Sequence, residues 1–270
     1  MELTSHFSQG KPALHYRTGG EGPAVVFIHG YGEDNKIWDT ILPSFESHQV
    51  FLFDLPGFGK SEVWKGYELS DLANAYLEVI DSSGIGEFSA FGHSMGGYTT
   101  CEFIATIPDR LRSTGLIHSH PFGDSDETKA ARLEKIKHLE EYGPNGYLKA
   151  FIRILYSPTF VEENTELVNQ MYEQALTFPT NAYIQALHAM HGRANRSAAI
   201  SKFEKPILFM VGTEDLAVPM KESMEQLSLA PAAQVELLDG IGHSSMLECP
   251  EVARAIFKEF LDFTEKFYSK

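Results

Sequence analysis

Short apolar runs alternate with amphipathic stretches along most of the chain. These runs are rich in Val, Ile, Leu and Phe and cover residues 24–28, 50–53, 88–91, 114–117, 206–211 and 235–238. Runs that are apolar on both faces are typical of strands covered by helices on both sides of a parallel sheet. The alternation of strands and helices therefore predicts an α/β fold with a mostly parallel, doubly wound sheet.

Two stretches carry apolar residues at helical spacing. The first begins at a predicted N-cap, Ser70, and its stripe is Leu72, Tyr76, Leu77 and Ile80. The second follows Pro250, and its stripe is Val252, Ile256, Phe257, Phe260 and Leu261. Both stripes indicate packing against a core. The first 20 residues instead predict an antiparallel hairpin at one edge of the sheet, with a turn at residues 9–12 that includes Lys11.

The pattern changes between Pro121 and Ser201, where no strand-like run occurs. Four helical patterns follow one another instead, with apolar residues at positions 133/136/139, 148/151/152/155, 167/171/175 and 184/187/190. We therefore expect an α/β core made of residues 1–120 and 202–270. Residues 121–201 are expected to form an all-helical cap inserted in that core.

Composition and charge narrow the possible partners. The 270 residues are 43% hydrophobic and 22% charged, which is typical of a globular protein, and the formal net charge is −15. Such a charge repels phosphate backbones and anionic lipid heads, and no run of Lys and Arg offsets it. We expect a small-molecule substrate, no nucleic-acid partner and no membrane insertion, since nowhere do about 18 consecutive apolar residues occur.

The two cysteines, Cys101 and Cys249, indicate the compartment. They form neither a disulfide framework nor a Cys/His cluster of the kind that binds metal. Reduced, unpaired thiols are typical of the cytoplasm, and the N-terminus lacks a basic region followed by an apolar stretch. The expected location is cytoplasmic, and neither a metal nor a cofactor is expected.

The strongest local motif is G-x-S-x-G at residues 92–96, which follows a predicted strand and precedes a predicted helix. A serine on a sharp strand-to-helix turn projects its hydroxyl into a site, and the flanking glycines let the crowded backbone close. The helix N-terminus also directs free N–H groups at developing negative charge. This context makes Ser94 the candidate nucleophile.

A serine nucleophile needs a base, and the base needs an orienting carboxylate. Asp215 follows the apolar run at 206–211, and His243 follows the run at 235–238, so each lies in a loop beyond a strand end. The candidate triad is thus Ser94, Asp215 and His243. Glu214 and Asp239 are alternatives for the acid, and so is Asp124, which comes after the preceding predicted strand.

Together these motifs resemble the α/β-hydrolase superfamily over most of the chain. Two further motifs carry the resemblance: the H-G-Y-G at residues 29–32 is similar to the family's oxyanion loop, and residues 54–61 are similar to its D-x-P-G-x-G-x-S turn. The resemblance implies an α/β-hydrolase fold with a helical cap. It also implies an oxyanion hole formed by the backbone N–H groups of Tyr31 and Met95.

Four histidines are further candidates for a substrate pocket. His118 and His120 follow the predicted strand at 114–117, at the sheet end where ligands of open α/β sheets bind. His29 lies within the H-G-Y-G motif at residues 29–32. His93 lies within the G-x-S-x-G motif at residues 92–96, the strand-to-helix turn that we call the elbow. A role in hydrogen bonding that shapes the loops is the alternative, most of all for His29, because His243 already occupies the place of the base.

A serine nucleophile favours acyl transfer to water, and we predict a carboxylic ester hydrolase. Thioester hydrolysis and cleavage of activated C–C bonds by the same triad, as by a hydrolase or lyase, remain alternatives. A ligand-binding receptor on the same fold is an alternative of another class, although a complete triad argues against it. The physiological substrate, the cap residues that face the pocket and the oligomeric state are not predicted.

Overall fold

A computed structural model describes residues 1–10 and 12–268. Its eight strands form one sheet in the order β1-β2-β4-β3-β5-β6-β7-β8. The strands are β1 (Thr4–Phe7), β2 (His15–Gly19), β3 (Ala24–Ile28), β4 (Gln49–Phe53), β5 (Phe88–His93), β6 (Leu111–Ile117), β7 (Ile207–Gly212) and β8 (Ala233–Leu238). Every pair from β4 to β8 is parallel. The predicted α/β class and mostly parallel sheet are confirmed.

The first two strands form the expected hairpin at one edge of the sheet. β1 pairs antiparallel with β2, and β2 pairs antiparallel with β4. Lys11, which belongs to the predicted turn, lies outside the described residues. The six other strands, β3 to β8, run in a common direction, so their carboxyl ends meet at one edge of the sheet.

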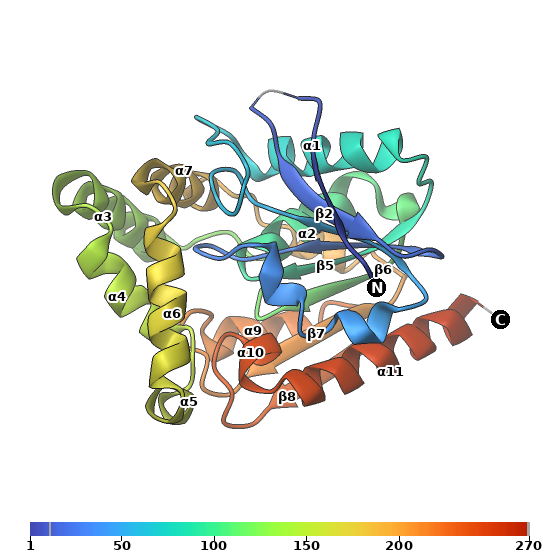
Figure 1. The fold of residues 1–270 in the computed structure, drawn as a ribbon. Coiled ribbons are helices and arrows are strands. Elements are labelled where there is room, and N and C mark those ends of the chain that lie inside the picture. Colours follow the sequence, from blue (N-terminus) through green and yellow to red (C-terminus); the bar gives the residue numbers. More distant parts are fainter. Residues whose placement is uncertain (11, 269–270) are drawn as a thin grey trace.

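Helices cover both faces of the sheet (Figure 1). One face packs against α1 (Leu69–Ser82) and α2 (Met95–Thr106). The other packs against α11 (Pro250–Tyr268) and the short 3₁₀ turns η1 (Asn35–Trp38) and η2 (Leu42–Phe45). The remaining short elements are η3 (Pro108–Arg110), α9 (Met220–Leu227) and α10 (Ser245–Glu248). Alternate side chains of β3 to β7 therefore enter two separate apolar cores, whereas Val235 and Leu237 of β8 are exposed.

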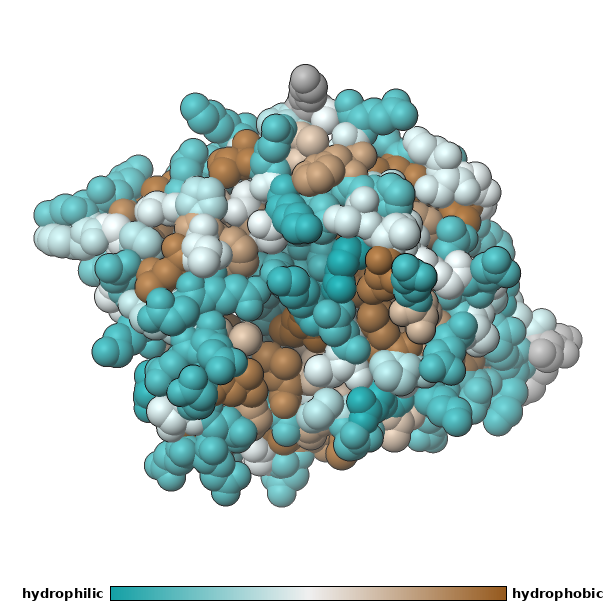
Figure 2. All heavy atoms as spheres, in the orientation of Figure 1, coloured by the Kyte–Doolittle hydropathy of each residue, from teal (hydrophilic) through white to brown (hydrophobic). Residues whose placement is uncertain are grey.

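A run of helices leaves the sheet after β6 and returns before β7. It comprises α3 (Asp126–Tyr142), α4 (Asn145–Ile154), α5 (Pro158–Glu163), α6 (Thr165–Leu176), α7 (Thr180–His191) and α8 (Ser197–Ile200). In Figure 1, α3 to α7 stand together beside one end of the sheet. On the face seen in Figure 2, hydrophilic side chains cover much of this helical segment, with apolar patches between them.

Two details of the predicted helices are wrong. α1 begins at Leu69 with Glu68 as its N-cap, not Ser70, because Glu68 and Asp71 form a reciprocal capping box. On α11, Val252 is 49% exposed, although the sequence pattern places it in the apolar stripe. The other members of that stripe are buried.

None of the helices among the described residues is long and apolar enough to cross a membrane.

Candidate active site

Ser94 lies at the turn between β5 and α2. Its backbone has φ 51° and ψ −116°, a positive-φ conformation that residues with a Cβ rarely adopt. The Ser94 N–H donates to the Ile117 carbonyl over 3.0 Å, and the Ser119 hydroxyl donates to the Ser94 carbonyl over 2.7 Å. Backbone strain of this kind persists only where the surroundings hold it, and it clusters at functional sites.

Two glycines make this turn sterically possible. A Cβ on Gly92 would lie 2.2 Å from the carbonyl oxygen of Gly96. A Cβ on Gly96 would lie 2.1 Å from the carbonyl oxygen of Ile28 on the neighbouring strand. Either side chain would collide with backbone that cannot move independently. The G-x-S-x-G spacing is thus a packing requirement of the strand-turn-helix geometry.

His243 and Asp215 lie side by side in the loops after β8 and β7. The Nδ1 atom of His243 lies 2.7 Å from Oδ2 of Asp215. The other carboxylate oxygen, Oδ1, accepts the backbone N–H groups of Ala217 and Val218 over 2.8 and 2.9 Å. With Nδ1–H donated to the carboxylate, Nε2 of His243 is the ring atom left to accept a proton.

The surroundings of Asp215 keep it ionised. Burial alone would raise the pKa of its carboxyl, but His243 and His118 outweigh burial and hold that pKa well below its usual range. One ligand atom from each of His118, Asp215 and His243 lies within 4.8 Å of the others, a spacing that a metal ion would also accept. In the structure, Nδ1 of His243 is hydrogen-bonded to Oδ2 of Asp215, and Nδ1 of His118 lies 3.5 Å from the same oxygen.

The loop after β3 and the first residue of α2 carry the backbone N–H groups of the candidate oxyanion hole. The N–H of Gly30 donates to Oε2 of Glu33 over 2.9 Å, which fixes this loop. Tyr31 follows, and its side chain lines the same cavity as Ser94. Met95 is the first residue of α2, so its N–H has no partner within the helix. No described residue accepts a hydrogen bond from the backbone N–H of Tyr31 or Met95.

Ser94 and His243 line one cavity of about 170 Å³. Its walls include Tyr147 and Phe151 from α4, Leu187 from α7 and Arg132 from α3. The inserted helices therefore supply much of the cavity wall. No hydrogen bond joins the Ser94 hydroxyl to a described residue, and catalytic hydrogen bonds often tighten only when substrate binds.

Most of the chain matches one known protein family. Residues 23–250 match the family described as "alpha/beta hydrolase fold". The chain belongs to the alpha/beta hydrolase fold family. The match begins just before β3 and ends at the start of α11, so it includes the elbow, both loops that carry Asp215 and His243, and the inserted helices.

Relatives of this hydrolase have several activities in their names. One is a Pseudomonas savastanoi protein named as a putative carbamate hydrolase, 25% identical over 254 residues, covering 92% of this chain and 97% of its own. Another is a pimeloyl-[acyl-carrier protein] methyl ester esterase of Nitrosomonas europaea, 26% identical, covering 88% and 96%. A thermophilic esterase from Thermogutta terrifontis shares the fold, with a TM-score of 0.89, 23% identity and coverage of 98% and 99%. Family and relatives together identify the chain as a hydrolase.

The four candidate pocket histidines lie around the cavity rather than among the residues that line it. His29 is fully buried; its Nε2 accepts the Leu55 N–H over 2.9 Å, and its Nδ1 contacts the Gly30 carbonyl. His120 accepts the Phe122 N–H at Nδ1 over 3.2 Å. Burial lowers the pKa of His120 to about 3, so it is neutral. Both histidines hold loops in shape.

His93 connects three parts of the site. Its Nδ1 lies 2.8 Å from Oε2 of Glu33, and its Nε2 lies 2.7 Å from the carbonyl oxygen of His243. Burial acts to lower the pKa of His93, but the Glu33 carboxylate raises it overall, and His93 in turn lowers the pKa of Glu33. With acceptors at both nitrogens, the ring carries two N–H donors. This buried ion pair joins the oxyanion loop, the elbow and the His243 loop.

His118 lies behind Asp215. Its Nε2 accepts the backbone N–H of Ser245 over 3.2 Å, so its proton is on Nδ1, which faces Oδ2 of Asp215 at 3.5 Å. Burial lowers the pKa of His118 to about 4. The neutral ring therefore presents an N–H toward the carboxylate, at a distance too long for a strong hydrogen bond.

The three alternative acids point elsewhere. Asp124 binds Arg132 and Arg193, and its side chain is 1% exposed. Asp239 is exposed and accepts the Thr213 hydroxyl over 3.3 Å. Glu214 is also exposed. Of the four carboxylates, Asp215 is the one that hydrogen-bonds His243 within the described chain.

Two glutamates of the site were not predicted from the sequence. Oε2 of Glu33 accepts hydrogen bonds from the Gly30 N–H and from Nδ1 of His93. Glu248 accepts the N–H groups of Gly242, Ser244 and Ser157, and so ties the His243 loop to the start of α5. No sequence motif marks either residue, because each binds backbone that only the fold brings near.

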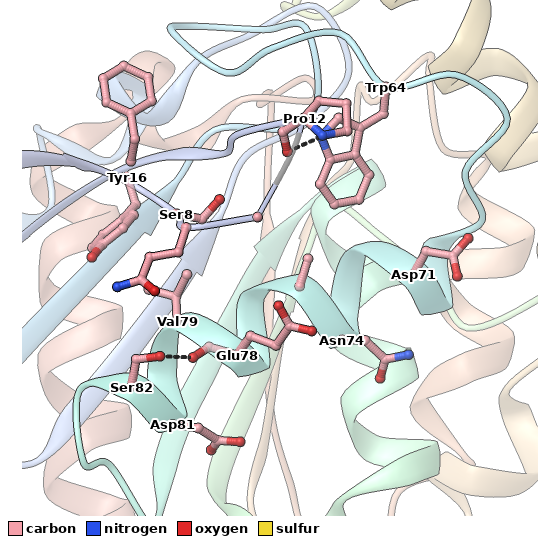
Figure 3. Close-up of a pocket in the computed structure, with 14 residues that line it drawn as sticks. Ser8, Pro12, Tyr16, Trp64, Asp71, Asn74, Glu78, Val79, Asp81 and Ser82 are labelled. Carbon is pink, nitrogen blue, oxygen red and sulfur yellow. Dashed lines mark hydrogen bonds between the residues drawn. The ribbon is translucent and has the colours of Figure 1, made fainter.

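A larger cavity, of about 720 Å³, lies between the N-terminal hairpin and α1 (Figure 3). It shares no lining residue with the cavity at Ser94. The Trp64 indole donates to the Pro12 carbonyl over 2.9 Å at one end, and Asp71, Asn74 and Glu78 come from α1. Its rim includes the neighbours of Lys11, which lies outside the described residues.

Proposed function

We propose that this hydrolase cleaves carboxylic ester bonds, with Ser94 as nucleophile, His243 as general base and Asp215 as orienting acid. One observation carries the proposal: a strained serine and a histidine already paired with a carboxylate line the same cavity. The esterase and carbamate hydrolase names of the two relatives support acyl transfer to water. The finer assignment to carboxylesterase chemistry is part of the proposal.

In the first half-reaction, the Ser94 oxygen attacks the ester carbonyl carbon and its proton passes to Nε2 of His243. The carbonyl oxygen becomes an oxyanion, which the N–H groups of Tyr31 and Met95 stabilise. The tetrahedral intermediate then expels the alcohol as the C–O bond breaks. His243 donates its proton to the leaving oxygen, and an acyl-Ser94 ester remains.

In the second half-reaction, water attacks the acyl-Ser94 carbonyl and gives a proton to His243. The carboxylic acid leaves as the bond to Ser94 breaks, and His243 returns the proton to the serine oxygen. Asp215 keeps the same tautomer of His243 throughout and stabilises the imidazolium that forms twice in each cycle. In both half-reactions, His243 thus accepts one proton and gives it back, so the triad ends each cycle in its starting state.

We also propose that residues 121–201 act as a cap on a core made of residues 1–120 and 202–270. The contact of the cap with the base loop supports this, since the His243 N–H donates to the Leu155 carbonyl over 2.9 Å. Side chains of α3, α4 and α7 on the cavity wall support a role in substrate choice. A cytoplasmic location fits the two free cysteines, Cys101 and Cys249.

A substrate screen tests the proposed function. Purified protein is assayed with p-nitrophenyl esters of increasing acyl length, with acyl-CoA thioesters and with activated C–C substrates. The proposal expects ester hydrolysis with the highest kcat/KM. Faster turnover of a thioester or C–C substrate, or no turnover of any ester, would overturn it.

Two serine variants serve as a matched pair in that screen. Ser94→Ala removes the nucleophile and is expected to lower kcat by on the order of 10⁶-fold. Ser89 lies on β5, the strand that leads to Ser94, and its hydroxyl is 2.9 Å from the hydroxyl of Ser113. Ser89 does not line the cavity, so Ser89→Ala should leave kcat near the wild-type value. Equal losses in both variants would indicate a folding defect rather than a missing nucleophile.

A further inference from the structure

The cavity at Ser94 is lined by positive charges, although the protein as a whole is negatively charged. The chain carries 37 Asp and Glu against 22 Lys and Arg. Yet two cations, Arg132 and Lys135, line the cavity, and no Asp or Glu is among its described lining residues. Both cations project from α3, three positions apart, which puts them on one face of the helix. The part of the cavity wall that α3 supplies is therefore positively charged.

The buried charges around Arg132 do not cancel. Asp124 binds two guanidinium groups: Arg132 through Nε and Nη2, and Arg193 through Nη1. Arg193 is itself 4% exposed in its side chain and also donates to the carbonyls of Phe122 and Met190. One carboxylate thus faces two cations, which leaves an excess of one positive charge at the cavity wall.

Arg132 keeps donors for a ligand. Its only other described contact is a weak one, from Nη1 to the Met190 sulfur at 3.5 Å. A guanidinium has five N–H donors, so both terminal nitrogens retain at least one that no described residue accepts. Desolvation and the nearby Arg132 charge lower the pKa of Lys135, and they outweigh the Asp124 carboxylate, which acts to raise it.

We infer that the cavity takes a substrate with a free carboxylate, carried on the acyl chain some way from the ester that Ser94 attacks. Arg132 and Lys135 would hold that carboxylate, and the apolar wall between them and the serine, including Phe151 and Leu187, would pack on the connecting methylenes. This inference rests on the proposed esterase function and specifies its substrate class. The rest of the acidic surface would disfavour more highly charged anions.

A pair of isosteric esters tests the inference. Mono-p-nitrophenyl adipate carries a terminal carboxylate, and p-nitrophenyl 6-methylheptanoate carries an isopropyl group in its place. The quantity measured is the ratio of their kcat/KM values. We expect wild-type protein to prefer the adipate ester by about tenfold or more, as a charge-assisted contact inside a cavity allows.

Two lysine variants provide matched controls on one helix. Lys135→Gln removes a cavity cation and should lower the ratio by about threefold. Lys137→Gln removes the same charge from α3. Both lysines are exposed, but Lys137 is not among the residues that line the cavity and it pairs with Glu134 over 2.6 Å, so the ratio should not change. Arg132→Met should lower the ratio by about tenfold, while Asp124 keeps Arg193 as its partner. Arg132→Lys retains the charge and should recover part of the ratio.

Adipate binding, measured by calorimetry without any reaction, separates this inference from the proposed function. Adipate should bind wild type and Lys137→Gln, and bind Lys135→Gln and Arg132→Met more weakly. Two results would overturn the carboxylate subsite. One is turnover of both esters with a kcat/KM ratio near one. The other is a ratio and an adipate affinity that neither Lys135→Gln nor Arg132→Met changes. Adipate binding that depends on Arg132 and Lys135, without turnover of either ester, would support the subsite and refute the esterase function.

Discussion

Replacing Asp215 with asparagine should inactivate the protein by reversing the tautomer of His243. In the wild type, Oδ1 of Asp215 accepts two backbone N–H groups, from Ala217 and Val218, and Oδ2 lies 2.7 Å from Nδ1 of His243. The amide oxygen of the introduced asparagine would stay with the two backbone donors, because they require an acceptor. The amide NH₂ would then face His243 and force its proton onto Nε2.

A histidine protonated at Nε2 cannot accept the serine proton. We expect kcat to fall by on the order of 10⁴-fold, equivalent to about 5.5 kcal/mol of transition-state stabilisation. Folding should change little, because the backbone hydrogen bonds and the packing remain. The assay is p-nitrophenyl ester hydrolysis together with a thermal melt, so that loss of activity is separated from loss of structure.

Variants of the other carboxylates are the controls for Asp215→Asn. Asp239→Asn and Glu214→Gln alter exposed side chains and should keep near-wild-type kcat. Asp124→Asn should act on stability instead, because it leaves two buried guanidinium groups without their carboxylate, at a cost of about 3–5 kcal/mol. Activity of Asp215→Asn within about tenfold of wild type would refute the reasoning, whatever the result for the controls.

Three further predictions concern pH, the cavity wall and the elbow. Between pH 6.5 and about 4 the unfolded chain protonates His118 while the folded chain does not, so this group lowers the unfolding free energy as pH falls, by up to about 1.4 kcal/mol per pH unit. His118→Asn should remove this share of the slope in denaturant titrations, while His120, whose pKa burial lowers to about 3, still contributes its own share. Phe151→Ala enlarges the cavity at Ser94 and should shift the chain-length preference of the ester series, whereas Met171→Ala, which lines a separate cavity beside η1, should not. Gly96→Ala should prevent folding, seen as loss of soluble protein, because its Cβ would meet backbone at 2.1 Å; a folded, active variant would contradict this.

The strands could be predicted because their apolar runs are continuous and short. The run at 24–28 coincides with β3, and β5 continues for two residues beyond the run at 88–91. The run at 114–117 missed the first three residues of β6, where Arg112 and Ser113 interrupt the apolar pattern. β6 pairs with β5 at Leu111 and again from Thr114, with a register shift at the two polar positions between them, and a single sequence does not show that pairing.

Helix ends and the outer parts of the site were harder to predict. A serine is a common N-cap, but the Glu68–Asp71 capping box places the start of α1 elsewhere. The positions of Ser94, Asp215 and His243 in the fold could be predicted because each residue follows the end of a strand. The buried pair of Glu33 and His93 could not, since its members are 60 positions apart and meet only through the sheet.

The most direct test of the central claim is covalent labelling of the whole protein with a fluorophosphonate, followed by mass spectrometry of its peptides. The account predicts one label per chain, attached to Ser94, and complete loss of both labelling and ester hydrolysis in Ser94→Ala. Labelling of another residue at one equivalent while Ser94 remains unmodified, or ester hydrolysis that survives in Ser94→Ala, would contradict it.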